Sequence, residues 1–247
     1  MWGDGVLVAA AVCPQTPLLV PEIAGGAASE LAEVRGGTFE AVQQLRRAEL
    51  DLVIAVAPGD EPGAREVRFG GTFRRFGVDL AVGNDVRGEP CTGLLIARWL
   101  LDACFPVDAP PCEGWEIGEE SGLDECMKLG RALAERSERV GLLVMGDGSA
   151  RRTAKAPGYL DERAVPFDDG IARALAEADT AALAAVDPKA ASAVMAAGRA
   201  PWQVLAGAVD ASGGPWCGRL LCYEAPYGVG YFSAFWEPEP ESELGLE

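Results

Sequence analysis

Three short apolar runs, separated by segments with helical spacing, constrain the fold of this chain more than any other feature. The runs occupy residues 6–13, 52–57 and 140–145, and such runs are typical of strands covered on both faces. Apolar side chains at helical spacing are found in residues 27–50, 93–104, 123–136 and 168–209. This alternation of buried strands with helices predicts an α/β fold, a three-layer sandwich in which helices flank a central, mostly parallel sheet.

Turn-forming residues divide the rest of the chain. Breaks in the helical patterns are expected near Gly36–Gly37 and at Asp187–Pro188. Residues 106–121 contain three prolines and are expected to form a surface excursion. The other expected elements are a loop or hairpin at 60–77, a short strand at 78–82 and a late pair of strands at 220–224 and 229–235. A single domain is predicted over residues 1–236, followed by an acidic, disordered tail at 237–247.

The chain contains no histidine. Histidine is the side chain that titrates near neutral pH without help and the commonest protein ligand for transition metals. Its absence excludes Ser-His-Asp triads, iron sites built from two histidines and a carboxylate, and His-bound zinc. Any chemistry therefore depends on carboxylates, thiols, Arg and Lys, hydroxyls, backbone groups or a borrowed cofactor.

The formal net charge of −17 limits the partners of this protein. An acidic surface repels phosphate backbones and anionic membranes, so neither nucleic acid nor a membrane is expected as a partner. No apolar run is long enough to span a bilayer. The seven cysteines include no CxxC pair, which indicates reduced thiols and a cytoplasmic protein. Cys217 and Cys222 lack the matching pair that a cysteine-only zinc site usually has.

The loops that follow the three apolar strands are the first candidates for a functional site. In α/β sheets, ligands bind outside the carboxyl ends of the strands. This rule selects residues 13–17, 58–62 and 146–152 by position alone.

The sequences of these loops resemble a known family. The first loop reads CPQTPLLVPE over residues 13–22, and the third reads MGDGSARR over residues 145–152. Shorter matches follow at APGY (156–159), FD (167–168), GRAP (198–201) and APYG (225–228). Together they resemble the LigB-type class III extradiol ring-cleavage dioxygenases and their Memo-like relatives, in which the corresponding segments read like PHPP-L-VPE, PH and SGDLSHR. The resemblance covers roughly residues 6–236 and implies a LigB-like domain.

The resemblance also implies where a metal would be bound. In active members the first two loops each supply a histidine to Fe(II), and a histidine in the third loop acts as acid and base. Here these positions hold Gln15, Gly59 and Ala150, and Ala197 stands where Memo-like relatives have a cysteine ligand. The expected protein is therefore a divergent pseudoenzyme without metal or cofactor that binds a small molecule or a protein partner.

Six residues are candidates for ligand binding, and none is assigned a catalytic or metal-binding role. They are Gln15, Asp60, Asp147, Ser149, Arg151 and Glu224. The planar guanidinium of Arg151 suits a carboxylate or another polar ligand. Asp147 and Ser149 also suit a hydrogen-bonded turn after a strand. Asp60 and Glu224 suit a turn and a strand end, although their oxygens are also of the kind that Mg²⁺ or Mn²⁺ prefers.

Other functions remain open at this point. The pocket can be retuned for metal-independent catalysis on a small substrate, aromatic ones included, with Asp147, Ser149, Asp60 or Glu224 as acid and base. Two other functions are possible: a residual extradiol-type oxidoreductase, and a non-catalytic companion of an active paralogue. Eight aromatic residues lie between 202 and 236, and most are expected in the core or in a homodimer interface.

Overall fold

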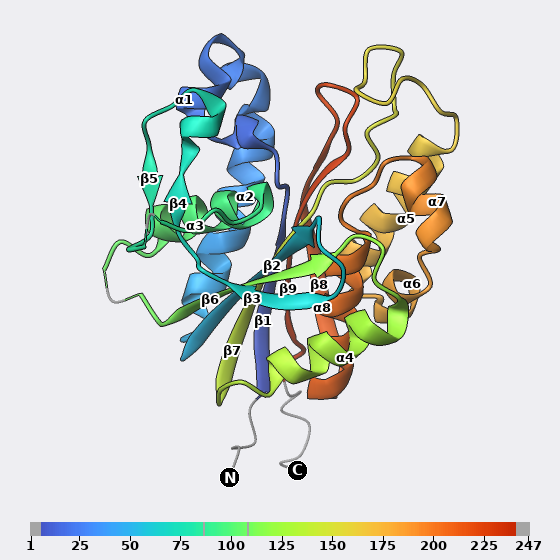
Figure 1. The fold of residues 1–247 in the computed structure, drawn as a ribbon. Coiled ribbons are helices and arrows are strands. Elements are labelled where there is room, and N and C mark those ends of the chain that lie inside the picture. Colours follow the sequence, from blue (N-terminus) through green and yellow to red (C-terminus); the bar gives the residue numbers. More distant parts are fainter. Residues whose placement is uncertain (1–5, 86, 108, 241–247) are drawn as a thin grey trace.

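The structure, a computed structural model, describes residues 6–85, 87–107 and 109–240. Its centre is a mixed seven-strand sheet in the order β3-β6-β2-β7-β1-β9-β8, with helices on both faces (Figure 1). The four strands β6, β2, β7 and β1 run parallel, whereas β3, β9 and β8 join as antiparallel neighbours at the two sides. The predicted α/β fold with a mostly parallel central sheet is therefore confirmed.

The strands are β1 (Val6–Cys13), β2 (Leu52–Gly59), β3 (Ala64–Val67), β4 (Gly71–Thr72), β5 (Ala81–Val82), β6 (Cys112–Gly118), β7 (Arg139–Met145), β8 (Trp216–Glu224) and β9 (Tyr231–Pro238). The α-helices are α1 (Pro21–Ala24), α2 (Ala32–Arg47), α3 (Thr92–Cys104), α4 (Leu123–Ala134), α5 (Ala164–Glu177), α6 (Thr180–Ala184), α7 (Pro188–Ala193) and α8 (Arg199–Ser212). Strands β4 and β5 pair with each other in a separate two-strand sheet.

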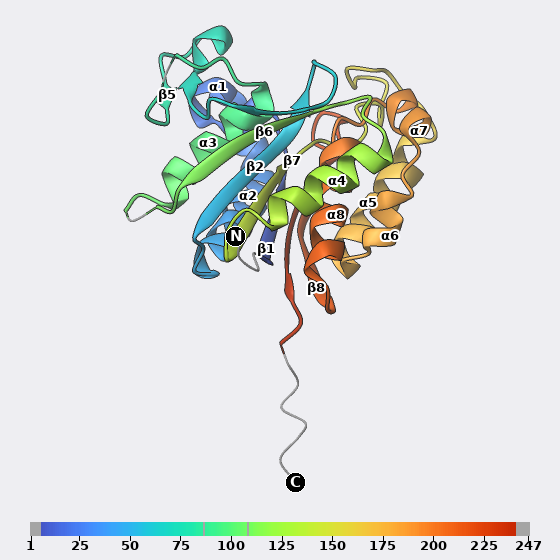
Figure 2. The same ribbon diagram turned by 60° about the horizontal axis from the view of Figure 1, so that its bottom comes forward.

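The sheet separates two hydrophobic cores, because successive side chains of a strand point to opposite faces. In β1, Leu7 and Val12 belong to the core under α4, α5 and α8, whereas Ala11 and Cys13 belong to the core under α2 and α3. Figure 2 shows α4, α8, α5 and α6 on one side of the sheet and α2 and α3 behind it. Burial on both faces explains why β1, β2 and β7 appear as continuous apolar runs.

One expected loop is a strand. Residues 106–121 were predicted to form a surface excursion, but β6 lies inside that range and pairs along its length with β2. The prediction was wrong because β6 carries Glu113 and Glu116, which do not suggest a strand in a sheet interior. Glu116 is nevertheless only 3% exposed, because Arg65 of β3 forms an ion pair with its carboxylate at 2.5 Å.

The expected helix break near Gly36–Gly37 is also absent, since α2 continues through both glycines. A Cβ atom at Gly37 would lie 2.5 Å from Cβ of Cys222. Glycine at this position therefore allows α2 to approach β8 closely, and it marks a packing contact rather than a helix end.

Other predicted boundaries are confirmed. The break at Asp187–Pro188 separates α6 from α7, and the Asp187 side chain caps α7 by accepting from the Ala190 amide at 3.0 Å. The late strands β8 and β9 pair antiparallel. Strand β9 continues to Pro238, two residues past the expected domain end, and residues 241–247 of the predicted tail lie outside the described residues.

The aromatic residues near the carboxyl terminus lie mainly in the core. Those buried within the chain are Trp202, Trp216, Tyr231, Phe232, Phe235 and Trp236. Their burial removes the sequence argument for a homodimer interface at these side chains. Among the described residues, no helix is both long and apolar enough to cross a membrane.

Candidate functional site

The loops after β1 and β7 meet at the carboxyl edge of the sheet, because these strands are parallel neighbours. The Gly146 amide donates to the Cys13 carbonyl at 3.0 Å. The Gln15 amide donates to Oδ1 of Asp147 at 2.9 Å, and the Asp147 carbonyl accepts from the Gly198 amide at 2.9 Å. Asp147 therefore joins the loop after β1 to the start of α8.

Asp147 is the titratable group at the centre of this edge. Its side chain is partly buried, and burial raises the pKa of its carboxyl to about 7, although the hydrogen bond from the Gln15 amide acts in the opposite direction. Tyr231 is buried nearby, and its pKa is raised to about 12, first by burial and then by the Asp147 carboxylate. A chain without histidine thus still has a group that titrates near neutral pH.

Ser149 belongs to a buried hydrogen-bond network. It is fully buried, and its hydroxyl and amide donate to Oδ2 and Oδ1 of Asp168 at 2.7 and 2.8 Å. The Asp168 carboxylate is also fully buried, and Arg152 lies 3.6 Å from it. This arrangement favours the hydrogen-bonded turn over ligand contact for Ser149. The role of Asp168 was not recognised from sequence, because its partner is 19 residues away in the chain.

Arg151 is held by backbone carbonyls. Its Nε donates to the Gly158 carbonyl and its Nη1 to the Ala193 carbonyl, both at 2.8 Å. Asp161 lies 3.8 Å from the same guanidinium. Arg151 thus connects the loop after β7 to the end of α7. A ligand bound by Arg151, as the sequence predicts, would have to compete with these carbonyl groups for its N–H donors.

The predicted carboxylates do not converge. Asp60 and Glu224 are both exposed, Asp60 after β2 and Glu224 at the end of β8. Four strand-to-strand steps separate β2 from β8 in the sheet, which corresponds to about 19 Å. Asp60 and Glu224 are therefore too far apart to act as an acid–base pair. Neither of them forms a hydrogen bond with Asp147 among the described residues.

The residues that the resemblance aligns with two iron ligands, Gln15 and Gly59, and with the acid–base histidine, Ala150, do not fit a metal site. Gln15, Gly59 and Ala150 provide no imidazole, and Gly59 has no room for one. A Cβ atom at Gly59 would lie 2.9 Å from Cβ and 3.1 Å from Oε2 of Glu116. Among the described residues, no group of three or more His, Cys, Asp or Glu side chains is arranged to hold a metal ion.

The Glu116 side chain fills this place and is itself fully engaged. Its Oε1 accepts from the Cys91 amide at 2.8 Å, and its Oε2 accepts from Nε of Arg65 at 2.9 Å. Burial also raises the pKa of the Cys91 thiol to about 12. Glu116 therefore connects β6, β3 and the start of α3, beside the residue where the resemblance predicts a metal ligand.

An open cleft lies beside the filled position and consists of two adjoining hollows. The alanine hollow, about 810 Å³, is formed by α7 and the segment before α8, and its wall includes Ala191, Ala193, Ala196 and Ala197. The acidic hollow, about 490 Å³, is formed by the loops after β2 and β6 and by the start of α4. Glu119 and Glu120 border both. We call the two together the carboxyl-edge cleft.

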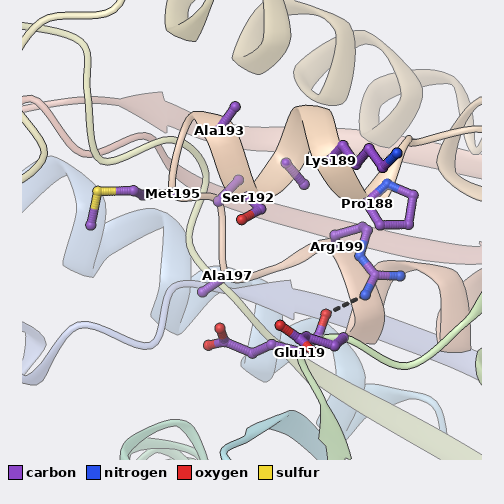
Figure 3. A pocket seen from close by; sticks show the side chains of 11 residues that line it. Glu119, Pro188, Lys189, Ser192, Ala193, Met195, Ala197 and Arg199 are labelled. Atoms are coloured by element: carbon purple, nitrogen blue, oxygen red, sulfur yellow. Dashed lines mark hydrogen bonds between the residues drawn. The ribbon is translucent and has the colours of Figure 1, made fainter.

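Figure 3 shows the alanine hollow, with Lys189 and Ser192 on one side and Glu119 on the other. Arg199 lies at its inner end and is only 3% exposed. Its Nη1 donates to the Ser121 carbonyl at 2.9 Å and to Oε1 of Gln203 at 2.8 Å, and its Nη2 donates to the Glu119 carbonyl. Arg199 thus fixes the loop after β6 against α8.

Of the six predicted site residues, only Asp60 borders this cleft. The sequence did suggest the neighbourhood through Ala197 and the GRAP segment at 198–201. It did not suggest Glu119, Glu120 or Ser121, because the strand that carries them to this edge, β6, was expected to be a loop.

Comparisons with known proteins bear on the fold alone. No model of a known protein family matches this chain, and no curated protein matches it. Among solved structures, it is similar to the crystal structure of the uncharacterized protein JW3007 from Escherichia coli K12. The TM-score is 0.52 at 14% sequence identity, and the match covers 93% of this chain and 99% of the other. The similarity therefore extends over almost the whole of both chains.

Proposed function

We propose that this protein is a histidine-less, metal-free relative of the LigB-like dioxygenases that binds a small organic molecule in the carboxyl-edge cleft. The single observation that carries the proposal is the contrast at the end of β2. Glu116 fills the space at Gly59, whereas the neighbouring cleft is open. The edge of the sheet is thus suited to hold a ligand and unsuited to hold the iron of the resembled family.

The cleft has the dimensions and location of a ligand site. Small-molecule sites in proteins are typically clefts of about 300–1,000 Å³ that combine apolar walls with a few polar groups. Both hollows fall in that range. They also lie outside the carboxyl ends of β2 and β6, where α/β sheets bind their ligands.

Loss of ring cleavage follows from the side chains at the edge. Iron of this kind needs neutral imidazoles and open coordination positions. Gln15 and Ala150 supply neither an imidazole nor a proton shuttle, and a histidine at the second ligand position, Gly59, would collide with Glu116. A residual extradiol reaction is therefore the least favoured of the alternatives.

A retuned enzyme is the second candidate, favoured by the pKa of about 7 at Asp147. A carboxyl group with such a pKa is suited to move a proton at neutral pH. Asp147 borders neither hollow of the cleft, and among the described residues no carboxylate contributes to the shift of its pKa. We therefore place binding ahead of catalysis.

The experiment compares two tryptophan variants in a thermal-shift screen of small organic molecules with the chelator-treated protein. Ser192 borders the alanine hollow, whereas Ala190 is exposed on the same helix and does not border it. We expect Ser192→Trp to abolish the stabilisation by any hit and Ala190→Trp to leave it unchanged. Hits that stabilise all three proteins equally, or no hits at all, would contradict the proposal.

A further inference from the structure

The acidic hollow collects carboxylates that have no ion-pair partner among the described residues. Its wall includes the carboxylates of Asp60, Glu61, Glu119, Glu120 and Glu125 and no lysine or arginine. None of the five takes part in an ion pair within the described part of the chain. By contrast, the carboxylates of Asp85, Asp102 and Asp161 each have an arginine partner.

Burial and the neighbouring carboxylates both act on Glu119. Its pKa is raised, first by burial and then by the neighbouring carboxylate of Asp60, with Glu120 adding to the effect. The Arg199 guanidinium acts in the opposite direction but contacts the Glu119 carbonyl rather than its carboxylate. A cation placed in the hollow would relieve this repulsion directly.

An unsatisfied hydroxyl lies in the same wall. Ser121 borders the acidic hollow and is only 6% exposed. Its Oγ is buried and has no hydrogen-bond partner among the described residues. Buried hydroxyls are normally paired, and an unpaired one costs about 1–3 kcal/mol. This second observation points to a hydrogen-bonding group that the protein itself does not provide.

The adjoining alanine hollow offers a different chemistry. Its wall includes the small apolar side chains of Ala191, Ala193, Ala196 and Ala197 and that of Met195, which is 49% exposed. The cations of Lys189 and Arg199 border this hollow and not the acidic one. Small side chains leave room for the body of a ligand, and exposed apolar surface is stabilised when a ligand covers it. Because Glu119 and Glu120 border both hollows, one molecule can reach both.

We infer that the ligand is an organic amine with an apolar body, its ammonium group in the acidic hollow and its body against the alanine wall. The inference rests on the proposed function and adds the ligand class to it. An ammonium group has three donors and a positive charge, which matches the unpaired carboxylates. An alkyl or aryl body matches the alanine wall, which a hydrated metal ion does not.

The test is isothermal titration of the full chain with hexylamine, compared with hexan-1-ol as its neutral analogue and with Mg²⁺ as a simple cation. The cleft variant is Glu119→Gln/Glu120→Gln. Its matched control, Glu135→Gln/Glu138→Gln, removes the same charge from two exposed residues outside the cleft. We expect hexylamine to bind the wild type and the control alike, and the cleft variant about tenfold more weakly. Hexan-1-ol is expected to bind at least about tenfold more weakly than hexylamine.

A general attraction of cations to an acidic protein gives a different result. Equal loss of hexylamine affinity in both double variants, or displacement of hexylamine by stoichiometric Mg²⁺, would overturn the inference. If the cleft variant does not fold, Glu61→Gln/Glu125→Gln removes two other carboxylates of the same hollow and is expected to weaken binding likewise.

Failure of this inference and of the proposed function can be told apart. If hexylamine does not bind but Ser192→Trp still abolishes binding of a neutral hit, the ligand class is wrong and the cleft stands. If Ser192→Trp leaves every hit bound, the cleft itself is wrong.

Discussion

At the scale of single residues, the backbone of Gly59 passes so close to Glu116 that a Cβ atom there would be 2.9 Å from the Glu116 Cβ. The Glu116 carboxylate is held by Arg65 and by the Cys91 amide, so it cannot move aside without losing these bonds. A second residue, Glu116, therefore occupies the space beside Gly59. A histidine placed at residue 59 would not find the space that a metal ligand needs.

We therefore expect Gly59→His to destabilise the fold by about 1–3 kcal/mol, because overpacking forces neighbouring groups to shift. Urea unfolding measures the change. Gly26→His is the matched control, since nothing lies within 4 Å of a Cβ atom at Gly26. The control is expected to change the free energy of unfolding by less than about 0.5 kcal/mol. Equal stability of both variants would show that Gly59 has room after all.

Asp147 leads to a prediction about pH. In the folded chain its carboxyl keeps a proton up to a pKa of about 7, against a usual value of 3.8. Between these pH values the folded state binds a proton that the unfolded state has released, so the free energy of unfolding falls as the pH rises. Asp147→Asn cannot ionise. The wild type should therefore lose stability relative to this variant from about pH 4 to pH 7, by at most about 1.4 kcal/mol per pH unit.

Urea unfolding at intervals between pH 4 and pH 8 checks this dependence. Asp210→Asn, at an exposed residue at the end of α8, corrects for the general effect of removing one negative charge. Parallel curves for the wild type and Asp147→Asn over the whole range would mean that the Asp147 carboxyl is ionised throughout.

At the scale of elements, Arg199 connects α8 to the loop after β6. The side chain is almost fully buried and donates to the carbonyls of Glu119 and Ser121 and to Gln203. We expect Arg199→Met to lower the free energy of unfolding by about 2–4 kcal/mol, because these buried acceptors would be left without partners. Hydrogen exchange should increase first at residues 119–121.

The control for this prediction is Arg173→Met. Arg173 is exposed on α5 and has no hydrogen bond or ion pair among the described side chains. Its replacement should change stability by less than about 0.5 kcal/mol. A similar small effect at Arg199 would show that the loop after β6 is held by other contacts.

The same elements show what the sequence could and could not predict. Strands β1, β2 and β7 were predicted because they are apolar on both faces. Strand β6 was missed because Glu116 is buried through Arg65, a residue 51 positions away. Hydrophobic periodicity depends only on neighbouring residues. It therefore does not identify a strand whose buried charge is neutralised by a residue far away in the sequence. The continuity of α2 was missed for a related reason. Gly37 allows close packing of α2 against β8, and this long-range contact is not visible in the local sequence.

At the scale of the whole molecule, the fold was largely predictable and the site only in part. The alternation of strands and helices led to the α/β architecture, and the position of three loops led to the carboxyl edge of the sheet. Asp147 was correctly placed at that edge, but its partial burial depends on tertiary packing. The cleft itself is formed by α7, α8 and the loop after β6, and so it depends on the one central strand that the sequence did not predict.

The central claim is that this fold holds an organic ligand and no metal in the carboxyl-edge cleft. Native mass spectrometry of the protein isolated from its own cells tests it most directly, with Ser192→Trp and Ala190→Trp expressed in parallel. We predict an organic adduct of a few hundred daltons, within the usual range for clefts of about this size, on the wild type and on Ala190→Trp but not on Ser192→Trp. One iron atom per chain with no organic adduct, or a bare mass for all three proteins, would contradict the account.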